Sequence, residues 1–452
     1  MAVSAKTTDL TIGHPKHTLW KFLLPMMVSV MFQQFYNIAD SMIAGRFVGE
    51  NALAAVGASY PITVIFMAFA TGSNLGASVV VSRLFGAKDY SNMKTAINTA
   101  FISCGILSLL LTVYGIVFCG PMMSWINTPD NVFSDGVLYL KIYTYGIVFL
   151  ILYNVCTGIF NAFGDSKTPL YFLIGSSVTN IILDIWFVTT FQMGVAGVAW
   201  ATFIAQGGAS ILAAGTLFRR LRAMPSSGKP ALFSGKLFGQ ICAIAIPSIL
   251  QQSVLSVGNL FVQVIVNRFG SAVIAGYSAA IKLNTFAITS FMALGSCLSS
   301  YTAQNLGAGK KDRIHTGFLT GIRLSLIASV PFFIFYFFLS KVMMGLFLKS
   351  DSQEAILAGV RYLRIVSPFY FMISIKLMTD GILRGSGAMI YFVIATIPDL
   401  ILRIFFASVF SPVFGSTGIW MAWPFGWITA TVLTMIFYRK ILQKNGNQPA
   451  VE

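Results

Sequence analysis

Long apolar runs, separated by short polar loops, fill most of this chain of 452 residues. We count about twelve runs, each long enough as a helix to cross ~30 Å of hydrocarbon at about 1.5 Å per residue. They lie near residues 19–45, 53–81, 95–119, 133–160, 168–188, 193–218, 238–267, 272–303, 315–340, 356–383, 388–410 and 416–438. Because 56% of the residues are hydrophobic and only 10% are charged, a chain of several soluble domains is excluded. The sequence therefore predicts an all-α integral membrane protein with twelve transmembrane helices.

The basic residues of the loops gather on one side of the predicted membrane. Both termini and the loops after even-numbered runs hold most of the lysines and arginines. The opposite loops hold only Arg46, Arg268, Lys341 and Lys349. This asymmetry puts both termini in the cytoplasm of a multi-pass protein of the plasma or inner membrane. It also accounts for the net charge of +16 without a nucleic-acid partner.

Motifs for enzyme chemistry are absent from the sequence. The five cysteines lie in apolar runs at unrelated spacings, so we expect small hydrophobic side chains rather than disulfides or ligands. His14 and His17 lie outside the runs and His315 lies at the very edge of one, which argues against a histidine relay or a membrane enzyme. No phosphate-binding GxxxxGK[ST] motif and no metal-binding cluster occurs. We expect a protein that is not an enzyme and has no cofactor and no structural metal.

The two halves of the chain resemble each other. GVLYLKI at 136–142 matches GVRYLRI at 359–365. Three further pairs match at nearly the same spacing: Pro25 with Pro247, Asn37 with Asn259, and Arg46 with Arg268. A near-constant offset of about 222 residues indicates a duplication. Since each copy has six spans, both copies insert in the same orientation, which predicts two six-helix bundles related by a pseudo-two-fold axis along the membrane normal.

A polar, basic connection rich in Pro, Ser and Gly follows the sixth run. We interpret residues 219–237 as a cytoplasmic linker loop between an N-lobe, residues 1–218, and a C-lobe, residues 238–440. Residues 441–452 are predicted to form a cytoplasmic tail.

A few acids lie at membrane depth, where a charge is costly and indicates function. They are Asp40, Asp184, Asp380 and Asp399. Helical rise places Asp40 ~9 Å and Asp184 ~6 Å below the outer ends of their spans, and Thr202 ~15 Å into the sixth span. Asn180 lies one helical turn deeper than Asp184 on the same face. We expect these four side chains of the first bundle to converge on one cavity.

Two ionised carboxylates in such a cavity repel each other, so the pair takes up a proton or a cation. Oxygens of Asn180 and Thr202 are ligands that a hard cation prefers. The sequence thus predicts a coupling site for H⁺ or Na⁺, with Na⁺ held at Asp40, Asp184 and Asn180. In the alternative interpretation, both acids are solvated near the interface and structural.

The second bundle differs in charge. At an offset of about 219 residues, Asn180 aligns with Asp399 and Asp184 aligns with Arg403. Asp399 and Arg403 are one turn apart, so we expect an ion pair with a structural role.

Further charges lie in the predicted second bundle. Asp380 lies one turn before Arg384, and we expect an interfacial pair near the cytoplasm. Lys282 and Lys376 lie in spans without an obvious partner, and Lys376 is expected to extend towards the bundle interface.

Two stretches indicate a family. FQQFYNIADSMIAGRFVGENALAAVGASYPI (32–62) resembles the region joining the first two spans of multidrug and toxic compound extrusion (MATE) transporters. TNIILDIWFV followed by GVAGVAWATFIAQ (179–206) is similar to their fifth and sixth spans. The resemblance covers essentially the whole chain. It implies a monomeric secondary active antiporter that exports lipophilic or cationic drug-like compounds in exchange for H⁺ or Na⁺ by alternating access of two lobes.

Within this family the chain is closer to the DinF-type branch, whose cation site lies in the N-lobe. That similarity implies coupling at Asp40, Asn180, Asp184 and Thr202, and bending of the first span at Pro25. NorM-type proteins use acids in the seventh and tenth spans, and the seventh span here has none. The substrate or cavity candidates are Gln34, Tyr36 and Asn37 in the first span and Gln251 and Gln252 in the seventh.

Two rival functions fit the sequence less well. A lipid-linked oligosaccharide flippase of the same superfamily would need a basic central cleft, for which the chain offers few residues. An integral membrane enzyme would need a polar cluster at one interface, which the histidine positions do not provide.

Overall fold

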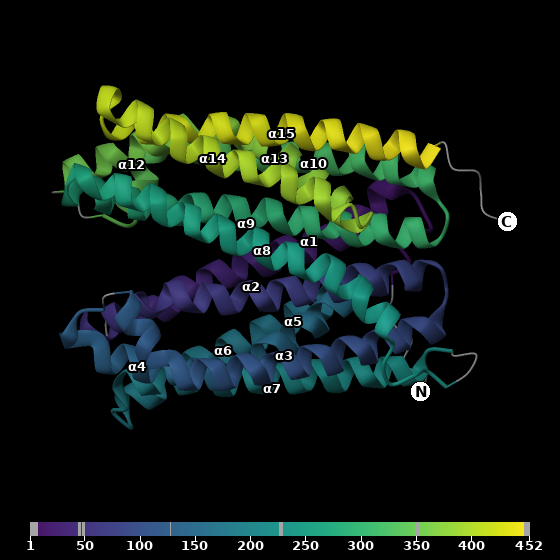
Figure 1. The fold of residues 1–452 in the computed structure, drawn as a ribbon. Helices are drawn as coiled ribbons and strands as arrows, with labels where there is room; N and C mark the ends of the chain where they lie inside the picture. The colour runs from purple at the N-terminus through teal and green to yellow at the C-terminus, as the bar shows by residue number, and fades with distance from the viewer. Residues whose placement is uncertain are drawn as a thin grey trace. The chain divides into compact units, whose positions relative to one another are not determined.

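A computed structural model describes residues 8–43, 47, 50–126, 128–225, 229–348 and 352–446. Arg46 and Lys349, and residues 447–452 of the predicted tail, lie outside the described residues. Within these ranges the chain is helical, as predicted (Figure 1). The elements are α1 (Pro15–Ile43), α2 (Glu50–Gly86), α3 (Tyr90–Trp125), α4 (Asp130–Tyr145), α5 (Ile147–Ala162), α6 (Lys167–Thr189), α7 (Gly194–Ala223), α8 (Gly235–Val266), η2 (Asn267–Phe269), α9 (Ser271–Gly307), α10 (Lys311–Phe337), α11 (Ser340–Gly345), α12 (Gln353–Val366), η3 (Ser367–Phe369), α13 (Tyr370–Gly385), α14 (Met389–Phe414) and α15 (Ser416–Gly446).

The helices account for the predicted spans. In the described part of the chain, ten helices are long and apolar enough to cross a membrane, and the bent pair α4–α5 forms an eleventh span. Helix α1, with 29 residues, has the length to complete a set of twelve. The prediction of an all-α integral membrane protein is confirmed.

One predicted span is broken, and another is continuous but contains a 3-10 turn. Helices α4 and α5 meet at an angle of 47°, and the residue between them is Gly146, which has low helix propensity. Helices α12 and α13 are separated by a 3-10 turn that contains Pro368, a residue without a backbone donor. Hydropathy alone could not show the break or the turn, because the residues on both sides of each are apolar.

Internal contacts divide the chain into two compact units. The first unit holds the described residues up to Leu10 together with Leu24–Ile249. The second unit holds Thr11–Leu23 and the described residues from Leu250 onward. The divisions therefore fall inside α1 and α8, close to the matched prolines Pro25 and Pro247, and not inside the polar connection.

Helix α2 is central to the first unit, where it packs against α3, α4 and α5, while α7 packs against α4, α5 and α6. Glycines allow the closest approaches. A Cβ atom on Gly158 of α5 would lie 2.7 Å from the Asn74 carbonyl oxygen of α2.

The start of α6 is held by a polar cluster. Asp165 Oδ1 accepts hydrogen bonds from the backbone N–H groups of Lys167 and Thr168, each at 3.1 Å. Such a side chain satisfies the open donors of the first turn. The Arg220 guanidinium of α7 pairs with the same carboxylate and packs over the Phe160 ring. This cluster fixes the position of α6 and α7, the helices that carry Asp184 and Thr202.

Helix α9 is central to the second unit, where it packs against α10, α12 and α13, and α15 packs against α12, α13 and α14. A Cβ atom on Gly381 of α13 would lie 2.2 Å from the Gly295 carbonyl oxygen of α9, so these helices touch through their backbones. Tyr362, Tyr370 and Trp420 are among the largest fully buried side chains.

Candidate functional site: a buried carboxyl pair

Two acids from different helices meet in the first unit. The carboxyl groups of Asp40, on α1, and Asp184, on α6, lie within hydrogen-bonding reach of each other. Asp184 is fully buried and Asp40 is half-buried. A carboxylate can only accept, so a hydrogen bond between two carboxyl groups requires a proton on one of them. The geometry therefore contains a place for one exchangeable positive charge.

Asn180 lies beside this pair, one turn before Asp184. When the amide nitrogen faces Tyr36, it lies 2.7 Å from the Tyr36 hydroxyl and 3.1 Å from Asp184 Oδ2. The amide oxygen then accepts the Thr202 backbone N–H at 3.0 Å. The opposite orientation offers a 3.3 Å bond to Thr202 Oγ1. We assign the first orientation, because it satisfies both ends of a buried amide.

The four residues that the sequence singles out for coupling thus lie together. Thr202 Oγ1 also donates to the Val198 carbonyl oxygen of its own helix at 3.1 Å. In the assigned orientation the Asn180 amide oxygen is used by the Thr202 N–H, so the oxygens that the site offers to a hard cation are those of the two carboxyl groups and the Thr202 hydroxyl. Asp40 Oδ1 and Asp184 Oδ1 have no hydrogen-bond partner among the described residues. Both atoms remain available to a proton or a cation.

Two tyrosines complete the site. Tyr36, a sequence candidate on α1, interacts electrostatically with Asp40 and Asp184. Tyr139 of α4 interacts with the same two acids. Sequence analysis missed Tyr139, although it lies in the repeated stretch GVLYLKI at 136–142. Its recurrence in both halves of the chain is the signal that could have indicated it.

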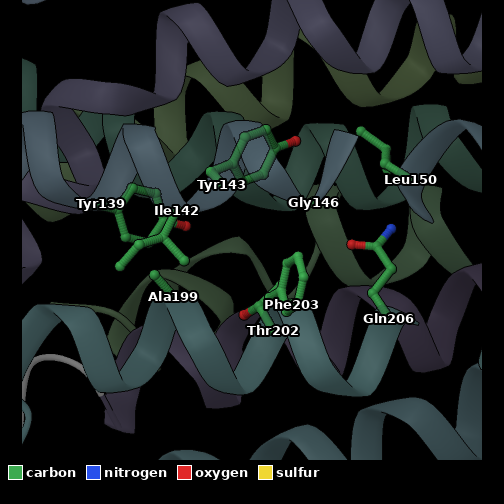
Figure 2. A pocket seen from close by; sticks show the side chains of 9 residues that line it. All are labelled: Tyr139, Ile142, Tyr143, Gly146, Leu150, Ala199, Thr202, Phe203 and Gln206. Atoms are coloured by element: carbon green, nitrogen blue, oxygen red, sulfur yellow. The ribbon is translucent and has the colours of Figure 1, made fainter. Parts of the chain in front are cut away.

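A pocket adjoins the carboxyl pair and shares Thr202 with it. In this structure it has room for about one water molecule, so a drug-sized occupant requires the pocket to widen. Its lining residues are Tyr139, Ile142, Tyr143, Gly146, Leu150, Ala199, Thr202, Phe203 and Gln206. Figure 2 shows the residues of α4 and α5 on one side and those of α7 on the other. A mainly apolar lining with aromatic rings and a few polar groups is typical of small-molecule sites.

The remaining cavity candidates are spread over two helices. Gln34 is half-buried and Asn37 is exposed on α1, in the first unit. Gln251 and Gln252 are half-buried on α8, in the second unit. Pro25 lies inside α1. The roles of these five residues stay predictions.

The second unit holds paired charges instead. Arg403 donates to Asp399 Oδ2 at 2.8 Å, so the ion pair expected from their spacing is present. Lys376 Nζ lies 2.6 Å from Asp380 Oδ2, and both side chains are buried. Lys282 is exposed on α9.

Two sequence predictions are wrong here. Lys376 does not extend to an interface without a partner, because Asp380 pairs with it in the core. Asp380 is not an interfacial partner of Arg384, whose guanidinium instead packs 5.4 Å from the centre of the Phe392 ring. Asp380 lies one turn from both cations, and the spacing could not decide between them. Helix α13 is buried on all sides at these residues, which excludes a solvated pair.

The fold and the carboxyl pair define a class, that of duplicated, polytopic membrane proteins with an ionisable site inside one helical bundle. The sequence profile of the MatE family matches residues 25–186 and 247–409, which is more than half of the chain and both copies of the repeat. The chain belongs to the MatE family. The resemblance to MATE transporters seen in the sequence is confirmed.

Named relatives agree with this assignment. The chain is 28% identical over 435 residues to the probable multidrug resistance protein YpnP of Bacillus subtilis, covering 96% of this chain and 97% of the relative. It is 25% identical over 445 residues to the probable multidrug resistance protein YoeA of the same organism, covering 95% of each. A FAD transporter of Shewanella oneidensis is 24% identical and covers 73% of this chain and 74% of its own length.

Solved structures share the fold. A MOP superfamily transporter from Pyrococcus furiosus superposes with a TM-score of 0.91 at 23% identity, covering 98% of this chain and 100% of the other. A MATE crystal structure in complex with MaL6 superposes with a TM-score of 0.92 at 22% identity and the same coverage.

Proposed function

We propose that this protein is a secondary active antiporter that exports lipophilic or cationic compounds in exchange for H⁺ or Na⁺, coupled at Asp40 and Asp184. The observation that carries the proposal is that these two carboxyl groups lie within hydrogen-bonding reach of each other beside the Asn180 amide. Two carboxyl groups in a poorly hydrated site are stable side by side only while they hold a proton or a cation.

Loss of the bound proton or cation changes how α1 and α6 pack against each other. Asp40 belongs to α1 and Asp184 to α6, so two unscreened carboxylates push one helix away from the other. Pro25 interrupts the hydrogen bonds of α1 and lowers the cost of bending it. Binding of the ion then favours one access state of the two lobes, and binding of substrate favours the other. Different affinities for the two states are sufficient for coupling.

The neighbouring pocket is our candidate for the substrate. Tyr139, Tyr143 and Phe203 offer aromatic faces, and Gln206 offers an amide. Aromatic faces attract organic cations and pack against lipophilic rings. Thr202 borders both the pocket and the carboxyl pair, so an occupant lies next to the ion. The relatives described as multidrug resistance proteins support this substrate class.

The position of the acids favours the DinF-type branch. The described residues of α8 include no acid, so a NorM-type site that needs one there lacks a ligand. We further propose a monomer in the plasma or inner membrane with both termini in the cytoplasm, on the basis of the loop charges. A lipid-linked oligosaccharide flippase gains no support, because the buried cations Lys376 and Arg403 are already paired with acids.

Efflux from proteoliposomes tests the proposal. The full chain is reconstituted with ethidium inside, and H⁺ and Na⁺ gradients are imposed separately. We expect one gradient to drive efflux by the wild type, and Asp40→Asn and Asp184→Asn to lose gradient-driven efflux by about tenfold or more. Asp130→Asn, an exposed acid of α4, is the matched control. Full gradient-driven efflux by both site variants would exclude coupling at this pair.

A further inference from the structure

Arg403 lies inside an aromatic box in the second unit. Its guanidinium packs 4.1 Å from the centre of the Trp423 ring and pairs with Asp399 at 2.8 Å. Tyr362 meets the rings of Trp420 and Trp423 edge-on, with centroids 5.3 and 5.7 Å apart. Arg403 also interacts electrostatically with Tyr362. A carboxylate closed in by aromatic faces is the arrangement by which proteins bind organic cations.

The box has more hydrogen-bonding capacity than Arg403 uses. Asp399 Oδ1, Arg403 Nε, the Tyr362 hydroxyl and the indole nitrogens of Trp420 and Trp423 find no partner within the described ranges. All five side chains are buried. Buried polar atoms are normally satisfied. Of these five, only Asp399 Oδ1 and the Tyr362 hydroxyl can accept from a cation, so these two are the open acceptors for a planar donor.

The repeat places this box at the counterpart of the carboxyl pair. The match of 136–142 with 359–365 makes Tyr362 the equivalent of Tyr139, which interacts with the acids of the first unit. Arg403 takes the place of Asp184 in the aligned helices. At this position the first unit has Asp184, whose charge a bound cation can neutralise. The second unit has Arg403 instead, whose positive charge belongs to the chain itself. The box is a cation site that the Arg403 guanidinium already occupies.

Arg403 also has a second contact outside the box. Its Nη1 donates to Asn259 Oδ1 of α8 at 3.4 Å, a long bond, and Asn259 is exposed. A polar side chain exposed on a transmembrane helix is expected to face a water-filled cavity rather than lipid. The guanidinium can therefore turn towards Asn259 and leave Asp399 to another cation.

We propose that Asp399, Tyr362, Trp420 and Trp423 form a second binding site, for planar organic cations, which Arg403 fills in this structure. A guanidinium or amidinium group of a substrate competes with Arg403 for this site. The transport role of the site rests on the proposed function, but the existence of the site does not.

Calorimetry on the purified full chain tests the site without any ion gradient. Methylguanidinium chloride is titrated into the wild type, Arg403→Ala, Arg403→Ala with Asp399→Asn, and Arg364→Ala. We expect Arg403→Ala to bind methylguanidinium about tenfold more tightly than the wild type, because the competing group is gone. Asp399→Asn should remove that gain. Arg364→Ala, which deletes an exposed cation of α12, should behave as the wild type.

A second variant covers the case in which Arg403→Ala does not fold. Arg403→Gln removes the charge but keeps a donor for Asp399, and the same tighter binding is expected. Equal binding by the wild type and a folded Arg403 variant overturns the proposal, as does a gain that survives Asp399→Asn. Because no transport is measured, failure of gradient-driven efflux leaves this result unaffected, and the two proposals fail separately.

Discussion

Asp40 and Asp184 lie on helices far apart in the sequence and come within hydrogen-bonding reach of each other in the interior of the first unit. Their contact holds α1 against α6 only while a proton or a cation offsets the second negative charge. The pair is thus both a contact between helices and a titratable element, and this double role leads to the first two predictions.

The first prediction concerns pH and stability. Raising the pH removes the shared proton and leaves two carboxylates in a poorly hydrated site, so the wild type should lose stability as the pH rises. In Asp184→Asn the amide still bonds to Asp40 without any proton. Its thermal unfolding temperature, measured in detergent between pH 5 and 9, should therefore vary less with pH. A parallel decline in the variant and the wild type would show that the pair does not control this dependence.

The second prediction separates the two ions. Thr202 contributes a neutral hydroxyl oxygen of the kind that Na⁺ needs and a proton does not. If Na⁺ is the coupling ion, Thr202→Val should lower Na⁺-driven efflux by about tenfold while its pH-driven efflux stays that of the wild type. Thr189→Val, at an exposed position on α6, is the control for loss of a hydroxyl. An equal effect of Thr202→Val on efflux driven by either gradient would contradict a role as an ion ligand.

The convergence of Asp40 and Asp184 could be predicted because depth is a simple function of position along a helix. Carboxylates are rare at this depth, so two of them at a similar depth in one bundle are expected to face the same interior site. Tyr139 could not be placed in the same way. It is one of 16 tyrosines in a chain rich in aromatic residues, so its depth in α4 does not single it out.

The pairing of Lys376 with Asp380 shows a second limit of the sequence. Asp380 has a cation one turn before it and another one turn after it, and spacing treats the two alike. Packing decides between them, because Arg384 is drawn to the Phe392 ring and Lys376 Nζ also reaches the Thr396 hydroxyl at 3.4 Å. Such a choice depends on neighbours from another helix, which a single sequence does not show.

The third prediction tests this buried ion pair. Lys376→Met leaves Asp380 charged and unpaired in the core, and should lower the free energy of unfolding by about 3–5 kcal/mol. Lys376→Met with Asp380→Leu removes the pair and should recover part of that loss, because Arg384 then stays buried without the acid with which it interacts. Unfolding in a denaturing detergent, followed by circular dichroism, gives the comparison. If the single variant were as stable as the double variant, the pair would not hold the core together.

The last prediction concerns the backbone contact between α9 and α13. A Cβ atom on Gly381 would lie 2.2 Å from the Gly295 carbonyl oxygen, and neither atom belongs to a flexible side chain. Gly381→Ala must therefore separate the two helices, and we expect it to lower the free energy of unfolding by about 1–3 kcal/mol. Gly175 of α6 is the matched glycine, because a Cβ atom added there would have no neighbouring atom within 4 Å. Gly175→Ala should leave stability unchanged or raise it by up to about 1 kcal/mol, because alanine favours a helix more than glycine does. Similar losses in both variants would show that the cost comes from helix propensity or membrane insertion and not from the contact between α9 and α13.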